Sequence, residues 1–261
     1  MLKTRVITAV IALLALIVVL FFLPARVAEA VIALAVIAGA WEWSGFLGSK
    51  STALRAGYVV LIAALLAAFA VPLAEQTLLL LQVALVWWLL AFLWTFFYPT
   101  PIPAAVRWIC GVLVLLPLYV ALIELYRLGS LWLLFLLLIV WAADMGAFFA
   151  GKTMGKVKLA PQISPGKTWE GAIGGLIAVA LLILGRSFFV DSNLAILLPF
   201  CLAIGAISIV GDLTVSMFKR TAGIKDSGTL FPGHGGVLDR VDSIAAAAPL
   251  FVLGMHMLGG L

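Results

Sequence analysis

The residues best suited to chemistry lie in one segment, 216–242, which reads SMFKRTAGIKDSGTLFPGHGGVLDRVD. Basic and acidic side chains crowd together there: Lys219, Arg220, Lys225, Asp226, His234, Asp239, Arg240 and Asp242. Glycines accompany them at positions 223, 228, 233, 235 and 236, and glycine lets backbone N–H groups approach an anion closely. A solvated loop would explain the basic residues but neither the aspartates nor the glycines. Because lysine and arginine suit phosphate oxygens, the segment predicts a phosphate-binding site, with the ring of His234 displayed between two glycines.

Carboxylates within apolar runs are the second chemical feature, because a charge inside a membrane span is costly. Asp212 lies in the run AIGAISIVGDLTVSMF, and Asp239 and Asp242 open the next apolar run at a spacing that shares a helix face. A hairpin of these two helices would bring Asp212 near Asp239. Mg²⁺ prefers a few carboxylates together with phosphate and water oxygens, so this pair is a candidate metal site. The alternative is a buried ion pair of Asp212 with Lys219 or Arg240.

A second polar loop, 151–170, reads GKTMGKVKLAPQISPGKTWE. Its segment Ser164–Thr168 resembles a phosphate-binding turn that leads into a helix, with Glu170 in the first helical turn. A strict P-loop is excluded, because position 161 is proline and no strand precedes it. Anion binding by Lys167 at the helix N-terminus is still expected on physical grounds.

Other polar residues lie within or beside apolar runs. Asp144 precedes the second loop and either faces the same site or pairs with Lys152 or Lys156. Glu42 and Glu124 lie near the ends of their runs, where a carboxylate can simply reach the membrane interface. Three further residues are interpreted as structural: Cys110, Cys201 and His256.

The remainder of the chain has the composition of an integral membrane protein. Of its 261 residues, 66% are hydrophobic and 10% are charged, against about a quarter charged in soluble domains. Hydropathy places about nine spans of roughly 20 residues each, at 5–23, 27–47, 55–73, 76–97, 104–125, 130–150, 171–190, 193–218 and 241–259. The predicted fold class is therefore all-α and polytopic. We expect one membrane domain over 1–261, in which helices of 1–129 precede the site-bearing part, 130–261.

Nine spans place the two termini on opposite sides of the membrane. The distribution of basic residues indicates which side is cytoplasmic. Of the 16 lysines and arginines, all except Arg26, Arg127 and Arg186 fall on the side of the N-terminus. This bias predicts that the N-terminus and both polar loops are cytoplasmic. The apolar run 6–23 is longer than that of a signal peptide, so we expect it to remain as the first span. We attribute the net charge of +5 to cytoplasmic loops near anionic lipid rather than to nucleic-acid binding.

Taken in order, the polar runs resemble the signature of a known family, the phosphatidate cytidylyltransferases or CDP-diacylglycerol synthases. The runs that carry the resemblance are Ser216–Arg220, Lys225–Asp226, Pro232–Gly236 and Leu238–Asp242. An upstream run, from Asp144 through Gly155–Lys156 to Ser164–Gly171, is also similar to that family. The resemblance covers the second half of the chain by motif and the first half only by hydropathy.

The resemblance implies that CTP and phosphatidate react to give CDP-diacylglycerol and pyrophosphate, with Mg²⁺ required and a second cation left open. It implies that Asp212 and Asp239 bind the metal, and we add Lys219 and Arg240 to them as the expected catalytic set. The expected substrate-binding residues are Ser164, Lys167, Thr168, Ser216, Arg220, Lys225, Asp226, His234, Gly235, Gly236, Asp242 and Asp144.

The implied partners are CTP, phosphatidate and membrane lipids, with no nucleic acid and with a homodimer left open. The implied location is the plasma (inner) membrane of a bacterium, with the site facing the cytoplasm. One alternative is a CTP-dependent enzyme that acts on another lipid, because the signature does not report the lipid tail. A less favoured alternative is an ion-coupled transporter, since polarity is confined to one half and one side and no internal repeat is present.

Overall fold

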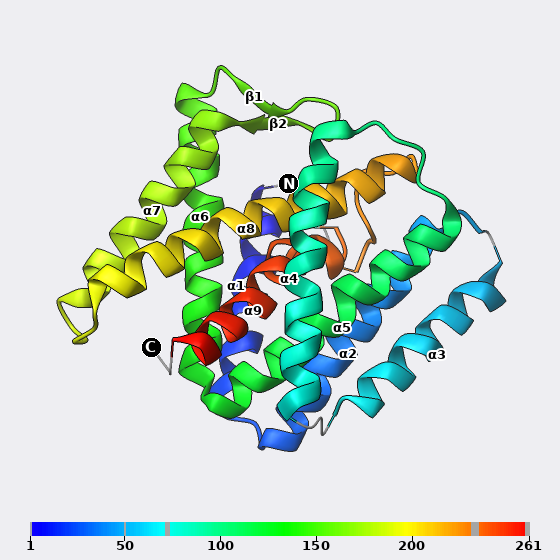
Figure 1. The fold of residues 1–261 in the computed structure, drawn as a ribbon, viewed down its shortest axis with the longest axis horizontal. Coiled ribbons are helices and arrows are strands. Elements are labelled where there is room, and N and C mark those ends of the chain that lie inside the picture. Colours follow the sequence, from blue (N-terminus) through cyan, green and yellow to red (C-terminus); the bar gives the residue numbers. More distant parts are fainter. Residues whose placement is uncertain (1, 50, 71–73, 231–234, 259–261) are drawn as a thin grey trace.

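A computed structural model describes residues 2–49, 51–70, 74–230 and 235–258. Over these residues the chain forms nine α-helices, one short 3-10 helix and a two-stranded hairpin (Figure 1). In chain order the elements are α1 (Leu2–Phe21), α2 (Ala25–Ser44), η1 (Gly45–Leu47), α3 (Thr52–Ala68), α4 (Ala74–Phe97), α5 (Ala104–Leu128), α6 (Ser130–Met154), β1 (Lys158–Ala160), β2 (Ser164–Thr168), α7 (Trp169–Ser187), α8 (Leu194–Thr221) and α9 (Leu238–Met257).

The helices of the described residues confirm the predicted polytopic helical architecture. Each predicted span corresponds to one helix, and the ends differ by a few residues. By length and composition, six helical segments are able to cross a membrane: Ala25–Leu47, Glu75–Phe97, Ala104–Leu128, Ser130–Met154, Trp169–Ser187 and Leu194–Thr221. Val10–Phe21 and Thr52–Ala68 are apolar but shorter. Buried apolar residues from Leu20 to Met255 form one cluster that includes both halves of the chain.

The segment Ser164–Thr168 is a β-strand, and its interpretation as a phosphate-binding turn was wrong. The expectation that no strand precedes position 161 was also wrong, because β1 ends at Ala160. β1 and β2 pair antiparallel, with Lys158 opposite Thr168 and Ala160 opposite Ser164. The connecting turn is closed by a hydrogen bond from the N–H of Ile163 to the carbonyl of Ala160, and Pro161, with its fixed φ, suits that turn. The hairpin therefore brings the end of β2 directly to the start of α7.

Thr168 and Glu170 join the hairpin to α7. The Thr168 hydroxyl accepts a hydrogen bond from the N–H of Gly171 over 3.1 Å, which caps the helix N-terminus. The Glu170 carboxylate accepts from the N–H of Val157 over 3.1 Å, and the N–H of Trp169 donates to the carbonyl of Val157. The hairpin is thus held against the helix by contacts at both of its ends.

Glycines allow α6 and α7 to pack closely along their length (Figure 1). A Cβ at Gly175 would lie 2.6 Å from the carbonyl oxygen of Ala143, and one at Gly146 would lie 2.6 Å from the Cβ of Ala178. Small residues let helix backbones approach each other in a membrane, where dispersion contacts replace the hydrophobic effect as the main attraction. α6 and α7 therefore form a rigid wall beneath the hairpin.

α8 and α9 pack side by side in opposite directions, and α9 begins near the end of α8 (Figure 1). Gly211 makes this approach possible, because a Cβ there would lie 3.0 Å from the Cβ of Ala246 and 3.3 Å from the Cα of Ser243. Asp212 follows directly in the chain. The glycine therefore places this aspartate at the closest approach of the two helices.

The α6–α7 packing can be tested by one substitution made at two positions of α7. Gly175→Ala would crowd the Ala143 carbonyl, whereas a Cβ at Gly185 meets nothing within 4 Å. We expect Gly175→Ala to lower the free energy of unfolding by about 1–3 kcal/mol, measured as a lower melting temperature in detergent. Gly185→Ala should leave that temperature unchanged or slightly higher, because alanine favours helix. Equal melting temperatures for the two variants would contradict the close packing.

Candidate active site

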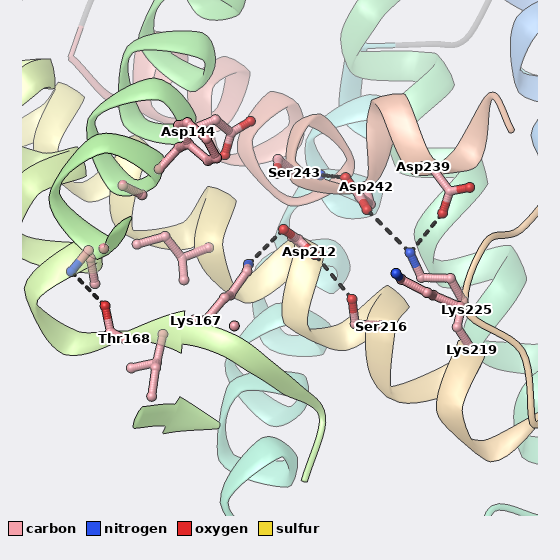
Figure 2. Close-up of a pocket in the computed structure, with 18 of the residues that line it drawn as sticks. Asp144, Lys167, Thr168, Asp212, Ser216, Lys219, Lys225, Asp239, Asp242 and Ser243 are labelled. Carbon is pink, nitrogen blue, oxygen red and sulfur yellow. Dashed lines mark hydrogen bonds and ion pairs between the residues drawn. The ribbon is translucent and has the colours of Figure 1, made fainter. Parts of the chain in front are cut away.

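A cavity of about 670 Å³ opens between α6, β2, α7, α8 and α9 (Figure 2). Both polar segments reach it, because the hairpin contributes β2 while α8 and α9 contribute their adjoining ends. The predicted site residues that line it are Asp144, Lys167, Thr168, Asp212, Ser216, Lys219, Arg220, Lys225, Asp226, Asp239, Arg240 and Asp242. Residues far apart in the sequence therefore surround a single space.

Three predicted residues that the structure describes, Ser164, Gly235 and Gly236, are not among those that line the cavity. Ser164 begins β2, where it pairs with Ala160. Gly235 has a φ of 79°, a left-handed conformation that favours glycine, so its role in the structure is conformational. Gly236 donates its N–H to a carboxylate oxygen of Asp239 over 2.9 Å. His234 lies outside the described residues.

Lys219 of α8 joins the start of α9 through a buried ion pair (Figure 2). Its ammonium lies 2.7 Å from Asp239 and 3.9 Å from Asp242, and these side chains are 9%, 7% and 11% exposed. At this burial each charge must be compensated inside the protein, because it has lost most of its hydration. One lysine of α8 therefore compensates the charges of two aspartates in the first turns of α9.

The second carboxylate oxygen of Asp239 accepts hydrogen bonds from the backbone of the glycine-rich loop. It accepts hydrogen bonds from the N–H of Ser227 over 2.8 Å and from the N–H of Gly236 over 2.9 Å. The loop between α8 and α9 is thus tied at two points to the carboxylate that binds Lys219. Glycine at position 236 allows this backbone approach, as the composition of the loop indicated.

Asp212 forms its ion pair with the hairpin rather than with its own helix or α9 (Figure 2). Its Oδ2 lies 2.6 Å from the ammonium of Lys167, and its Oδ1 accepts a hydrogen bond from the Ser216 hydroxyl over 3.1 Å. The alternative that paired Asp212 with Lys219 or Arg240 was therefore wrong. Lys219 pairs with Asp239 instead. The partner of Asp212 is Lys167, which lies on β2 and also lines the cavity.

The carboxylates around the cavity act on one another electrostatically. The charge of Asp212 acts on both Asp144 and Asp242, so these three groups share one environment. Asp144 lines the cavity, which favours its interpretation as a site residue over a pairing with Lys152 or Lys156. Asp242 on α9 is thus a closer electrostatic neighbour of Asp212 than the sequence indicated, while Asp239 is engaged by Lys219.

The donor set around the cavity suits a hard cation in its chemistry. Within the described ranges, no cluster of three or more histidine, cysteine or acidic residues is arranged to hold a metal by itself. Carboxylate oxygens nevertheless line a space large enough for phosphate groups, and Mg²⁺ is commonly held by one or two carboxylates together with substrate phosphates and water. The residues therefore fit a metal that arrives with a phosphate ligand.

The basic residues of the cavity differ in how they are engaged. The Arg220 guanidinium donates to the carbonyls of Ile163 and Ile224, so it fastens the hairpin turn to the end of α8. Within the part of the chain that the structure describes, no ion pair engages Lys225 or Arg240. The charges of these two residues are therefore available to an anion in the cavity.

Part of the cavity lining is apolar and was not predicted. Ala147 and Phe148 of α6, Ala172 of α7 and Ile209 of α8 belong to this part. In a chain this rich in apolar residues, nothing in the sequence separates those that line a cavity from those that pack or face lipid. The cavity lining thus combines charged side chains with apolar ones, and α6 contributes both kinds.

Comparison with known proteins gives matches along nearly the whole chain. The model of the Cytidylyltransferase family matches residues 3–258. A phosphatidate cytidylyltransferase of Pseudomonas aeruginosa is 42% identical over 261 residues, which cover 96% of each chain. One from Haemophilus influenzae is 39% identical over 285 residues, covering 96% of this chain and 97% of the relative. A third, from Staphylococcus aureus strain COL, is 49% identical over 124 residues, 47% of this chain and 48% of the relative.

The two lysine–aspartate pairs of the cavity offer a matched test of burial. The Lys219–Asp239 pair is 9% and 7% exposed, whereas the Lys167–Asp212 pair is 25% and 29% exposed. Lys219→Met would leave buried carboxylates uncompensated, and we expect a loss of about 3–5 kcal/mol in unfolding free energy. Lys167→Met should cost about 1 kcal/mol or less, because solvent screens that pair. Thermal unfolding in detergent measures both, and an equal or larger loss for Lys167→Met would contradict the assignment.

Proposed function

The chain belongs to the cytidylyltransferase family, and we propose that it transfers CMP from CTP to phosphatidate, giving CDP-diacylglycerol and pyrophosphate. The observation that carries this proposal is the cavity itself. It joins cations suited to a triphosphate with apolar residues suited to a lipid, in a chain that matches phosphatidate cytidylyltransferases along nearly its full length.

The proposed reaction exchanges one phosphoanhydride bond for another. A phosphate oxygen of phosphatidate attacks the α-phosphorus of CTP, a new O–P bond forms, and the bond to the β-phosphate breaks as pyrophosphate leaves. Both reactants are anions, so the protein's task is mainly to neutralise charge and hold the reacting atoms in line. Phosphatidate is ionised near neutral pH, and the attack therefore needs no general base.

The basic residues of the cavity supply that neutralisation in this proposal. Lys225 and Arg240, which form no ion pair within the described residues, are the candidates for direct contact with phosphate oxygens. Lys167 and Lys219 hold the aspartates and also line the cavity, so they can add charge close to the reacting phosphates. Arg220 contributes mainly by holding the hairpin in place.

We propose Asp212 and Asp239 as the carboxylates that hold Mg²⁺ when the nucleotide is present. A bound Mg²⁺ supplies positive charge to the phosphate oxygens of both reactants. Asp242 and Asp144 line the same cavity as Asp212, so their carboxyl oxygens are further candidate ligands for a cation in that space. A second cation is compatible with this number of carboxylates.

The proposed orientation lets the two substrates arrive by different routes. The hairpin and the end of α8, each of which carries two basic residues, lie at the same end of the helices (Figure 1). By the positive-inside rule this end faces the cytoplasm, where CTP is dissolved. Phosphatidate would enter from the bilayer past the apolar residues of α6 and α7 that line the cavity. We propose a bacterial inner membrane as the location.

A direct assay tests the proposed substrates. Purified protein in detergent, given CTP labelled at the α-phosphate, phosphatidate and Mg²⁺, should transfer the label to CDP-diacylglycerol. Diacylglycerol in place of phosphatidate should give no labelled lipid, because it lacks the attacking phosphate. Product with a different lipid phosphate and none with phosphatidate would reassign the substrate. The absence of CTP turnover with any lipid would refute the proposed function.

Three aspartate-to-asparagine variants test the proposed metal carboxylates. Asp212→Asn and Asp239→Asn should each lower kcat by at least about 100-fold, because each removes a carboxylate that would hold Mg²⁺ and that positions a cavity lysine near the reacting phosphates. Asp191→Asn, an exposed change in the α7–α8 connection, should leave turnover unchanged. Folding is checked by size-exclusion profile and melting temperature. Near wild-type turnover in either cavity variant would show that its carboxylate is dispensable.

A further inference from the structure

Glu42 of α2 lies outside the cavity but contacts the loop that forms it. Its side chain is buried, with 7% of the residue exposed. Its carboxylate accepts hydrogen bonds from the N–H of Val237 over 2.9 Å, from the N–H of Leu238 over 2.8 Å and from the Ser227 hydroxyl over 2.8 Å. The idea that this residue simply reaches the membrane interface was therefore wrong.

The contacts of Glu42 suit the N-terminus of a helix. Leu238 is the first residue of α9, and helix N-termini leave several backbone N–H groups without intrahelical partners. A carboxylate satisfies these donors and also interacts favourably with the positive end of the helix dipole. The cap of α9 comes from a side chain about 195 residues away, since Val237 itself provides no side-chain cap.

Glycines bring the loop against this carboxylate. A Cβ at Gly228 or at Gly236 would collide with the Glu42 carboxylate. Gly236 also donates its N–H to Asp239, and Ser227 donates its N–H to Asp239 and its hydroxyl to Glu42. Glu42 and Asp239 therefore hold the same stretch of loop from two sides.

Glu42 is itself held by neighbours that pack against α8. The ring of Trp43 lies 4.9 Å from the ring of Phe218, which precedes Lys219 in the chain. The Trp43 indole also donates to the carbonyl of Arg107 over 2.9 Å. On the other side of Glu42, the Arg55 guanidinium donates to the carbonyl of Trp41. The end of α2 is thus a fixed support for the site.

We propose that Glu42 is a positioning residue for the transfer reaction, which sets Ser227, Val237 and the start of α9 so that Asp239 meets Lys219 correctly. Only the expected effect of Glu42 on the rate of the transfer reaction rests on the proposed function. The contacts of Glu42 with Val237 and Leu238 are a separate claim that can be measured without turnover.

The charge and the shape of Glu42 can be separated by two substitutions. Glu42→Gln keeps the shape but turns one acceptor into a donor, whereas Glu42→Asp keeps the charge but shortens the side chain. We expect kcat, normalised to the fraction of protein that binds CTP, to fall about 10- to 100-fold in Glu42→Gln. Glu42→Asp should retain more activity than Glu42→Gln. A residue that only filled space would give the opposite order.

Hydrogen exchange provides the measurement that does not depend on activity. In Glu42→Gln, the amides of Val237 and Leu238 should exchange faster than in the wild type, while those of α6 remain unchanged. Glu75→Gln, at an exposed position at the start of α4, is the matched control and should alter neither exchange nor turnover. Wild-type exchange at Val237 and Leu238 in Glu42→Gln would overturn the proposal, even if the protein proved inactive with phosphatidate.

Ser227→Ala decides the question if Glu42→Gln cannot be recovered in folded form. This change removes one hydrogen bond to Glu42 but keeps the N–H that donates to Asp239. We expect kcat to fall by up to about tenfold, the loss of one hydrogen bond to a charged group, with faster exchange at the amides of Val237 and Leu238. Unchanged kcat together with unchanged exchange would overturn the proposal.

Discussion

The ammonium of Lys219, 2.7 Å from Asp239 and 3.9 Å from Asp242, is the contact that joins α8 to α9 at the cavity. Charges at this burial have lost most of their hydration, so the pair is tolerable only where the remaining carboxylate oxygens also find donors. They do so here, because Ser227 and Gly236 donate to Asp239, and Ser243 donates to Asp242. The shape of the glycine-rich loop therefore follows from the need to satisfy one buried carboxylate.

A second layer of contacts supports this one from outside the cavity. Thr168 and Glu170 fix the hairpin that carries Lys167 to Asp212, and Glu42 caps the helix that carries Asp239. The first half of the chain, which has few polar residues, thus contributes a buried carboxylate that supports the site. In a cytidylyltransferase whose two reactants are both anions, such support matters because small displacements of charged groups change the barrier steeply.

Much of the fold could be predicted from the sequence, because apolar runs of the length of a membrane span leave few alternatives. The residues of the cavity were also predictable in large part, since charges are rare in this chain and costly in a membrane. Which charges pair could not be predicted. Lys167 reaches Asp212 only because residues 164–168 form a strand, and that depends on pairing with Lys158–Ala160. Glu42 was misjudged because two of its three hydrogen-bond partners are backbone N–H groups, which leave no mark in the sequence.

The account's central claim is that the nucleotide binds in the cavity between the hairpin, α8 and α9. Lysine acylation with a water-soluble reagent, quantified by mass spectrometry with and without CTP and Mg²⁺, tests it most directly. Lys225 and Lys167 line the cavity, and Lys158 on β1 is an exposed internal control that does not. The account predicts that CTP slows acylation of Lys225 and Lys167 and leaves Lys158 unchanged. Acylation of Lys225 and Lys167 at the same rate with saturating CTP as without it would contradict the claim.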